Sequence, residues 1–310
     1  MVNRQDKELN LTQATNGKAA LVYPYTLKSI LVPLLRKPKV AQFVKWSVYS
    51  LLLVNFVVYM IDDWQAYSAA LSDSAAINKI LETFSDSIDM AAWVVLVILF
   101  ELETYVLADR VLEDSTIRLV KLIRVACYVM IIYAAYGFTA NALDNFKITP
   151  LPEITDLCSP SVEGRFLQTN IVDFEAIAAE NCASISNDSA FFKIDVNVSL
   201  IGESVLRHVQ NMGWVDISNA YVWILVVLLI ELEVFLQEAD RFGSRLLTQV
   251  RLVKTTLYLV LSINAGIWFA TGYPIYAWDA FLWIVGFWAI ELNLASWEQE
   301  RVAELGIQQT

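Results

Sequence analysis

The sequence predicts an all-α integral membrane protein with six transmembrane helices, built as three tandem helical-hairpin repeats. Three observations lead to this prediction. Hydrophobic residues make up 57% of the chain and charged residues only 18%, whereas soluble domains contain about 45–50% apolar residues. Six apolar segments are each long enough to cross a bilayer core, which takes about 20 helical residues. The same polar residues then recur at the same spacing in alternate segments.

The six apolar segments are expected to be helical because the bilayer core holds no water to satisfy free backbone groups. None of them contains proline, which agrees with continuous helices. The predicted spans are Lys45–Ile61, Met90–Ala108, Val120–Ala142, Ala220–Glu238, Leu252–Ala270 and Ala277–Trp297.

Basic residues are concentrated on one side of the predicted membrane. Seventeen of the 22 lie before the first span, after the second, after the fourth or after the sixth. Because short loops rich in lysine and arginine stay in the cytoplasm, we expect both termini to be cytoplasmic in a plasma membrane or bacterial inner membrane. The polar, basic first forty residues do not predict a cleaved signal peptide.

The hairpins divide the chain into four predicted parts. The first is a cytoplasmic segment whose short apolar stretch is suited to an interfacial helix. The second hairpin differs from the others in the length of its outer connection. The parts are the N-terminal segment 1–44, repeat 1 over 45–117, repeat 2 over 118–244 with a large outer loop at 143–217, and repeat 3 with a short cytoplasmic tail over 245–310.

The even-numbered spans share one pattern of polar and aromatic residues. Each has aspartate or asparagine, then tryptophan four positions later, then glutamate eight positions after that. We interpret the tryptophan as a packing residue within each repeat, because its offset is fixed. The matching residues are Asp89, Trp93 and Glu101; Asn219, Trp223 and Glu231; and Asp279, Trp283 and Glu291.

The odd-numbered spans share a second pattern. Each has a basic residue four positions before a tyrosine, so the two side chains lie on the same helix face. Two independent patterns at matching places in three segments favour a real triplication over coincidence. The pairs are Lys45 and Tyr49, Arg124 and Tyr128, and Lys254 and Tyr258.

Ionisable residues inside a span are costly and usually face the protein interior. The two residues of each Glu-x-Glu pair point to nearly opposite faces, so only one can line a narrow channel. We assign the inward position to the first glutamate, because all three repeats share it, and expect the second, Glu103 or Glu233, to pair elsewhere. The predicted polar layer contains Glu101, Glu231, Glu291, Tyr49, Tyr128, Tyr258, Lys45, Arg124 and Lys254.

Two interpretations of this layer remain open. In the structural one, each glutamate accepts a hydrogen bond from a tyrosine and pairs with lysine or arginine, which fixes helix register. In the functional one, the three glutamates face a common cavity, where they bind a cation or relay protons. The matched basic residue in every repeat favours the structural interpretation.

The three cysteines are expected to serve structure rather than metal binding. Cys158 and Cys182 both fall in the large outer loop, where an oxidising compartment favours a disulfide between them. A single histidine and scattered cysteines cannot assemble a zinc site. In the same loop, apolar residues of Ser199–Met212 recur at helical spacing and predict a short helix at the outer membrane surface or on the loop.

Two classes of function follow from these features. The first is a channel or transporter for an ion, a proton or a small solute. The second is a non-transporting scaffold, assembly or sensor subunit that docks a protein partner through the outer loop 143–217. We predict no enzymatic activity and no cofactor, because no catalytic triad, phosphate-binding loop or metal-ligand cluster is present. With 33 acidic against 22 basic residues, nucleic acid is not an expected partner, and an oligomer is compatible with the sequence.

Overall fold

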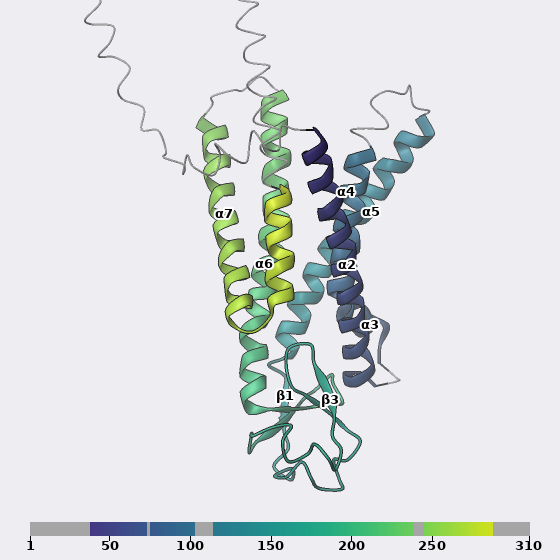
Figure 1. Cartoon of the computed structure of the whole chain (residues 1–310), viewed down its shortest axis with the longest axis vertical. Coiled ribbons are helices and arrows are strands. Elements are labelled where there is room, and N and C mark those ends of the chain that lie inside the picture. The colour runs from purple at the N-terminus through teal and green to yellow at the C-terminus, as the bar shows by residue number, and fades with distance from the viewer. Residues whose placement is uncertain (1–37, 73–74, 103–113, 239–244, 288–310) are drawn as a thin grey trace, which may run out of the picture. The chain divides into compact units, whose positions relative to one another are not determined.

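Figure 1 shows the computed structural model of the chain, which describes residues 38–72, 75–102, 114–238 and 245–287. The chain divides into two compact units, residues 1–47 and 48–310. Of the first unit, only helical residues 38–47 are described, so the fold below is that of the second.

Long helices make up most of the described chain. Their polar ends and apolar middles follow the pattern expected from the sequence. The helices are α2 (Pro38–Ala70), α3 (Ile77–Thr83), α4 (Ser85–Glu101), α5 (Asp114–Asp144), α6 (Glu203–Glu238), α7 (Arg245–Ala270) and a helix at Pro274–Phe287, here called the post-turn helix.

Within the described ranges, four helical segments are long and apolar enough to cross a membrane. Each contains most of one predicted span, so those four predictions are confirmed as long apolar helices. The segments are Trp46–Ala70, Arg118–Asp144, Glu203–Glu233 and Arg245–Ala270.

The predicted second and sixth spans are described only in part. α4 ends at Glu101 and the post-turn helix at Phe287, and both predicted spans continue into residues outside the described ranges. The turn before the post-turn helix contains Gly272 at φ +93°, a left-handed conformation that glycine adopts without steric cost, followed by Pro274 at the first helical position.

Large apolar side chains lie exposed along one face of α5. They recur every three or four residues, which is the spacing of a single helix face. Such a continuous exposed apolar stripe is unfavourable in water and suits contact with lipid. The stripe consists of Leu119, Leu122, Val125, Val129 and Ile132.

The prediction of an all-α chain is wrong for the connection between α5 and α6, residues 145–202, which we call the β-segment. It holds a five-stranded sheet of order β1-β4-β5-β2-β3. All neighbouring strands are antiparallel except β2 and β5, which are parallel. The strands are β1 (Ile148–Pro150), β2 (Phe166–Gln168), β3 (Phe174–Ala176), β4 (Phe191–Ile194) and β5 (Leu200–Gly202).

The β-segment has an apolar core of its own. Leu167 and Leu200 are each 1% exposed, and they pack with Phe191, Val162 and the disulfide-bonded Cys182. Strands of three or four residues bury little surface individually, so the sheet depends on this shared core and on the cross-link.

The predicted surface helix at Ser199–Met212 is instead the first part of α6, apart from its first four residues, of which Leu200–Gly202 form β5. Asp188 explains where α6 begins, because its carboxylate accepts bonds from the Ser204 backbone N–H and hydroxyl. A Cβ on Gly202 would lie 2.1 Å from Asp188 Oδ2, so this close approach requires glycine.

The β-segment packs against one end of the helices (Figure 1). Ile194 and Ile201 of the sheet form a buried cluster with Leu206 and Val209 of α6. Backbone bonds reinforce the junction, since the Val198 N–H donates to the carbonyl of the last residue of α2 at 2.6 Å. The sheet therefore covers the helix ends rather than lying apart from them.

Candidate functional site

The predicted polar layer is only partly described, and its best-defined members are the two glutamates of α6. Glu233 is 6% exposed, whereas Glu231 is exposed and accepts a hydrogen bond from Tyr128 Oη at 2.6 Å. The assignment of the inward position to the first glutamate is therefore wrong for this pair. Sequence spacing fixed the angle between the two side chains but not which of them faces the neighbouring helix.

Glu233 is sealed against two basic residues of α7. Lys254 Nζ bonds one carboxylate oxygen, and Arg251 Nε bonds the other at 2.7 Å. Lys254 is itself 5% exposed, so this is a buried ion pair between two helices. The arrangement is that of the structural interpretation, with Lys254 in its predicted layer but partnered by the second glutamate.

The remaining layer residues lie on several helices or outside the described part. Tyr49 on α2 and Arg124 on α5 are half-buried, and Tyr258 packs edge-on against the Trp223 ring at 6.4 Å. The charge of Arg124 acts on Tyr128, the residue that donates to Glu231, so these two predicted layer residues lie near that glutamate. The side chains of Lys45 and Glu101, and residues Glu103 and Glu291 as a whole, lie outside what the structure describes.

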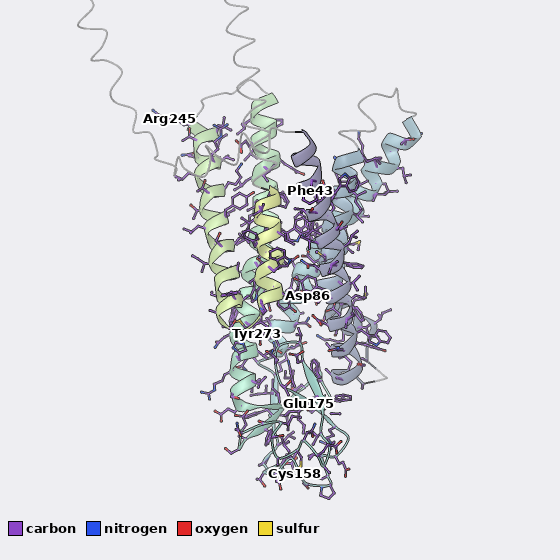
Figure 2. The ribbon with its side chains drawn as sticks, in the orientation of Figure 1. Phe43, Asp86, Cys158, Glu175, Arg245 and Tyr273 are labelled. Carbon is purple, nitrogen blue, oxygen red and sulfur yellow. A yellow bond between two sulfur atoms is a disulfide. The ribbon has the colours of Figure 1, made fainter. Side chains whose placement is uncertain are left out.

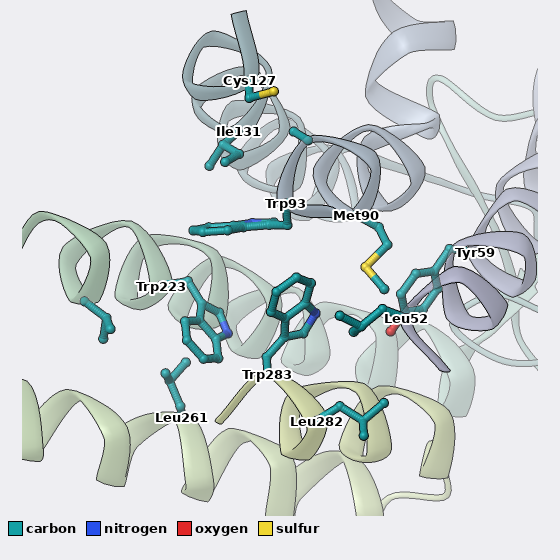
Figure 3. Packing of buried hydrophobic residues seen from close by; sticks show 12 residues of the cluster. Leu52, Tyr59, Met90, Trp93, Cys127, Ile131, Trp223, Leu261, Leu282 and Trp283 are labelled. Atoms are coloured by element: carbon teal, nitrogen blue, oxygen red, sulfur yellow. The ribbon is translucent and has the colours of Figure 1, made fainter. Parts of the chain in front are cut away.

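The three repeated tryptophans converge in the core of the helix bundle (Figure 3). The ring centroid of Trp93 lies 6.5 Å from that of Trp223 and 6.0 Å from that of Trp283. All three are nearly buried, at 7–8% exposure. They pack between hairpins, not within each one as the sequence suggested, so equivalent positions from three segments meet at one point.

The same point borders a cavity of about 240 Å³ between the helices and the β-segment. Six aspartates line it from four helices, and we call it the aspartate cavity. None of the described residues that line it is basic. The six aspartates are Asp62 and Asp63 of α2, Asp86 and Asp89 of α4, Asp216 of α6 and Asp279 of the post-turn helix.

A seventh lining aspartate, Asp144, is neutralised at the rim. It accepts hydrogen bonds from Lys79 and from Lys147, the latter at 2.8 Å. No ion pair joins the other six aspartates to any residue in the described ranges. The cavity therefore carries uncompensated carboxylates next to one that is paired.

Several of the six carboxylates are held in place by neutral donors. Trp93 Nε1 donates to Asp89 at 3.1 Å, and Asn55 Nδ2 donates to Asp279 at 2.7 Å. The Ser87 backbone N–H donates to Asp63 at 2.9 Å. These bonds fix the carboxylates in position without cancelling their charge.

Burial and mutual repulsion act on the two aspartates at the start of α4, which precede the predicted span. Burial, and then the charges of Asp63, Asp216 and Asp89, raise the pKa of Asp86 well above its ordinary value. Burial raises the pKa of Asp89 to about 7, with the Trp93 bond opposing the rise and Asp279 adding to it. Neighbouring carboxylates in a low-dielectric cavity hold protons for this reason. Figure 2 shows Asp86 where the helices approach the β-segment.

The asparagine that replaces aspartate in the second repeat also lines the cavity. The side-chain oxygen of Asn219 is buried and has no hydrogen-bond partner within the described part of the chain. A buried acceptor without a donor costs about 1–3 kcal/mol. The cavity thus presents an acceptor that a ligand or water can satisfy.

No protein-family model, curated protein or solved structure matches this chain. Its function is therefore argued from the geometry of the aspartate cavity alone.

The cavity was not predicted from the sequence, although the repeated motif contains six of its lining residues, namely Asp89, Trp93, Asn219, Trp223, Asp279 and Trp283. Asp89, Asn219 and Asp279 lie at or next to the outer ends of the predicted second, fourth and sixth spans, so the sequence presented them as span boundaries. Asp62, Asp86 and Asp216 carry no local pattern, because α2, α4 and α6 bring them together only in the folded bundle. The recurring Asp/Asn-x3-Trp motif was the one signal that pointed to the place.

The described residues contain no group of three histidine, cysteine or acidic side chains placed to hold a metal ion. The predicted disulfide is confirmed, since Cys158 and Cys182 are bonded with their Cα atoms 5.0 Å apart. It closes the end of the β-segment labelled at Cys158 in Figure 2.

Proposed function

We propose that this chain is a six-span membrane transport protein that receives a cation in the aspartate cavity. In this proposal α4 and the post-turn helix continue as the second and sixth spans, and both termini are cytoplasmic. The concentration of basic residues at the ends opposite the β-segment supports that orientation. The β-segment and the cavity then face the outer side.

The observation that carries the proposal is the convergence of repeated residues on one cavity. The lining residues include the Asp/Asn and the Trp of all three copies of the motif. Packing alone explains the tryptophans, but it does not explain why a charged or polar side chain accompanies each one into a shared space. A site at the meeting point of structural repeats is a common arrangement in transporters.

The charge of the cavity selects its ligand. Six aspartates without a basic partner create a negative potential that low-dielectric walls concentrate. An anion is repelled from such a site, and a neutral solute can gain hydrogen bonds from the carboxylates but does not offset their charge. A cation removes the repulsion that the aspartates exert on each other.

Proton exchange follows from the same repulsion. Burial raises the pKa of Asp89 to about 7, so this carboxyl is partly protonated near neutral pH when the cavity lacks a cation, and burial with neighbouring carboxylates also raises the pKa of Asp86. A bound cation stabilises the ionised carboxylates and releases those protons. Cation entry is therefore coupled to proton release in this proposal.

A non-transporting sensor or assembly subunit is the alternative, and one observation favours it. Glu233 is sealed by Lys254 and Arg251, which is the sign of a structural rather than a conducting polar layer. The disulfide-closed β-segment gives such a subunit a folded surface for a protein partner. In that case the aspartate cavity binds its cation without passing it on.

The test uses the full chain reconstituted in liposomes that contain a pH-sensitive dye. Adding potassium, sodium, calcium or tetramethylammonium chloride outside is expected to change the internal pH or produce a current for at least one cation. The double substitution Asp89→Asn with Asp279→Asn is expected to lower that flux at least 10-fold. Glu180→Gln is the matched control, because it removes an exposed carboxylate of the β-segment that does not line the cavity.

Flux equal to that of protein-free liposomes for every cation contradicts transport. Flux that the double aspartate substitution leaves unchanged contradicts the role of the cavity. Flux that falls equally in Glu180→Gln shows a general surface-charge effect, which also contradicts that role. Substituting Glu231→Gln separately asks whether the predicted glutamate layer contributes, and unchanged flux there removes Glu231 from the pathway.

A further inference from the structure

We propose that the cation received by the aspartate cavity is a small organic ammonium ion. This inference rests on the proposed function and adds the chemical class of its ligand. It is carried by three features of the cavity: its aromatic wall, the spacing of its carboxylates and an unsatisfied amide oxygen.

The aromatic wall is the first feature. Beyond the carboxylates, nine aromatic side chains line the cavity, and they include Trp93, Trp223 and Trp283, which belong to one buried cluster. Their rings are tilted rather than stacked, with interplanar angles of 60° for Trp93–Trp223 and 56° for Trp93–Trp283. At centroid distances of 6.0–6.5 Å these rings pack directly against one another, and each also lines the cavity. Aromatic surface beside a carboxylate attracts a cation through cation–π contact, as in sites for quaternary ammonium groups.

The Asp89 carboxylate lies next to the tryptophans of the aromatic wall. Trp93 Nε1 donates to Asp89 at 3.1 Å, and the Trp223 and Trp283 ring centroids lie 6.5 and 6.0 Å from that of Trp93. A cation held by Asp89 therefore lies beside rings from two other helices. An ammonium ion with apolar substituents uses both surfaces, whereas a hydrated metal ion uses only the carboxylate.

The spacing of the carboxylates disfavours a directly bound metal ion. Calcium takes six to eight oxygen ligands and magnesium a near-octahedral set, so both need several acidic or carbonyl groups close together. The described residues contain no such cluster of three. The six aspartates surround a space instead of converging on a point, which suits a larger cation with its charge spread over alkyl groups.

The size of the cavity agrees with this ligand. Its volume of about 240 Å³ equals that of about eight water molecules at about 30 Å³ each. Asn219 adds a buried side-chain oxygen without a donor, placed to accept from an ammonium N–H or a hydroxyl. The second repeat thus supplies a neutral acceptor where the first and third supply carboxylates.

The experiment measures binding to the full chain in detergent micelles by titration calorimetry. The probes are tetramethylammonium chloride, potassium chloride, calcium chloride and tert-butanol, which has a size similar to tetramethylammonium but no charge. Tetramethylammonium is expected to bind saturably, and tert-butanol is not. Potassium and calcium at equal concentration are expected to compete weakly.

Two substitutions separate the aromatic contribution from the charge. Trp223→Leu is expected to weaken tetramethylammonium binding by roughly 5- to 30-fold, the range that cation–π contacts supply. Trp223→Phe keeps a ring and is expected to retain most of the affinity. If Trp223→Leu does not fold, Trp283→Leu replaces it, because Trp283 also lines the cavity. Trp214→Leu is the matched control, because Trp214 is 54% exposed and does not line the cavity.

Each outcome decides between the two proposals. Tetramethylammonium binding that Trp223→Leu weakens and Trp214→Leu does not supports the ammonium site. Binding of potassium or calcium alone, abolished by Asp89→Asn with Asp279→Asn, overturns the ammonium class and leaves cation transport standing. Tetramethylammonium binding that Trp223→Leu leaves unchanged in a folded variant overturns the aromatic site. Absence of binding by any cation overturns both proposals.

Discussion

Replacing Lys254 with methionine tests whether the polar layer of the helix bundle is structural. Lys254 and Glu233 are 5% and 6% exposed, so removing the lysine leaves a buried carboxylate that has lost its fully buried partner. Breaking a buried ion pair in this way costs about 3–5 kcal/mol. Arg251 still bonds Glu233 at 2.7 Å, so we expect the lower end, about 3 kcal/mol.

The complete experiment is a double-mutant cycle. Glu233→Gln alone leaves Lys254 as an uncompensated buried cation and is expected to cost a similar amount. The double variant removes both charges, and replacing a buried pair as a whole is often close to neutral. With each single cost near 3 kcal/mol and the double variant near neutral, the sum of the two single costs should exceed the cost of the double variant by a coupling energy of at most about 6 kcal/mol.

Unfolding can be followed through the free thiol of Cys127. That side chain is 3% exposed, and the other two cysteines form the disulfide. A thiol-reactive fluorophore therefore reports the opening of α5 in detergent as temperature rises. Additive destabilisation by the two substitutions refutes the structural pairing. Loss of flux in liposomes with unchanged stability refutes it also, and places the pair in the transport pathway.

Two further predictions concern the β-segment and the pH response. Cys158→Ser with Cys182→Ser removes a cross-link of sequence separation 24, and the lost loop-closure entropy is expected to lower the free energy of unfolding by about 3.5 kcal/mol. Amide hydrogen exchange should accelerate at Leu167 and Phe191 of the β-segment but not in α7. Equal acceleration in both places contradicts a cross-link that acts locally. Burial raises the pKa of Asp89 to about 7, so between about pH 4 and pH 7 the folded state keeps a proton that the unfolded chain has lost. The contribution of this group to the free energy of unfolding is therefore fully present below pH 4 and falls as pH rises through 7. Asp89→Asn should therefore stabilise the protein at pH 8.5 by at most about 4 kcal/mol and have little effect at pH 4, measured as thermal midpoints, and a larger gain at pH 4 refutes the assignment.

The long apolar helices were predictable because the bilayer imposes one strong rule on sequence. A span needs about 20 apolar residues and must satisfy its own backbone, so composition alone marks it. The β-segment obeys no such rule. Its strands have three or four residues, too few for an alternating pattern to stand out, and the core that unites them depends on contacts as distant as Leu167 with Leu200.

The position of Ser199–Met212 shows a different limit. Its apolar residues do recur at helical spacing, and residues 203–212 are helical, but that helix is continuous with the span that follows. The spacing of apolar residues identifies the buried face of a helix, but it does not show at which residue the helix ends. The Asp188 carboxylate that marks the start of α6 comes from a separate loop, so no local sequence signal reveals it.

The two α6 glutamates show why a repeat does not identify the buried residue. Glu231 is the position that all three copies share, and it is exposed, whereas Glu233 is sealed by α7. Which glutamate of the pair is buried depends on which neighbouring helix supplies the basic residues that pair with it. Lys254 and Arg251 are the decisive residues, and they lie in a different hairpin.

The predicted second repeat differs from the other two in two features, and both features contribute residues to the lining of the aspartate cavity. It replaces the repeated aspartate with Asn219, and it inserts the β-segment, of which Ile171 and Asn197 also line the cavity. A symmetric ring of three carboxylates under an open mouth would attract any cation. In the proposed site, asparagine in place of aspartate lowers the electrostatic attraction for cations in general. The β-segment residues that line the cavity limit the size and shape of the ligand. Together the two features favour a cation selected by shape and aromatic contacts over one selected by charge alone.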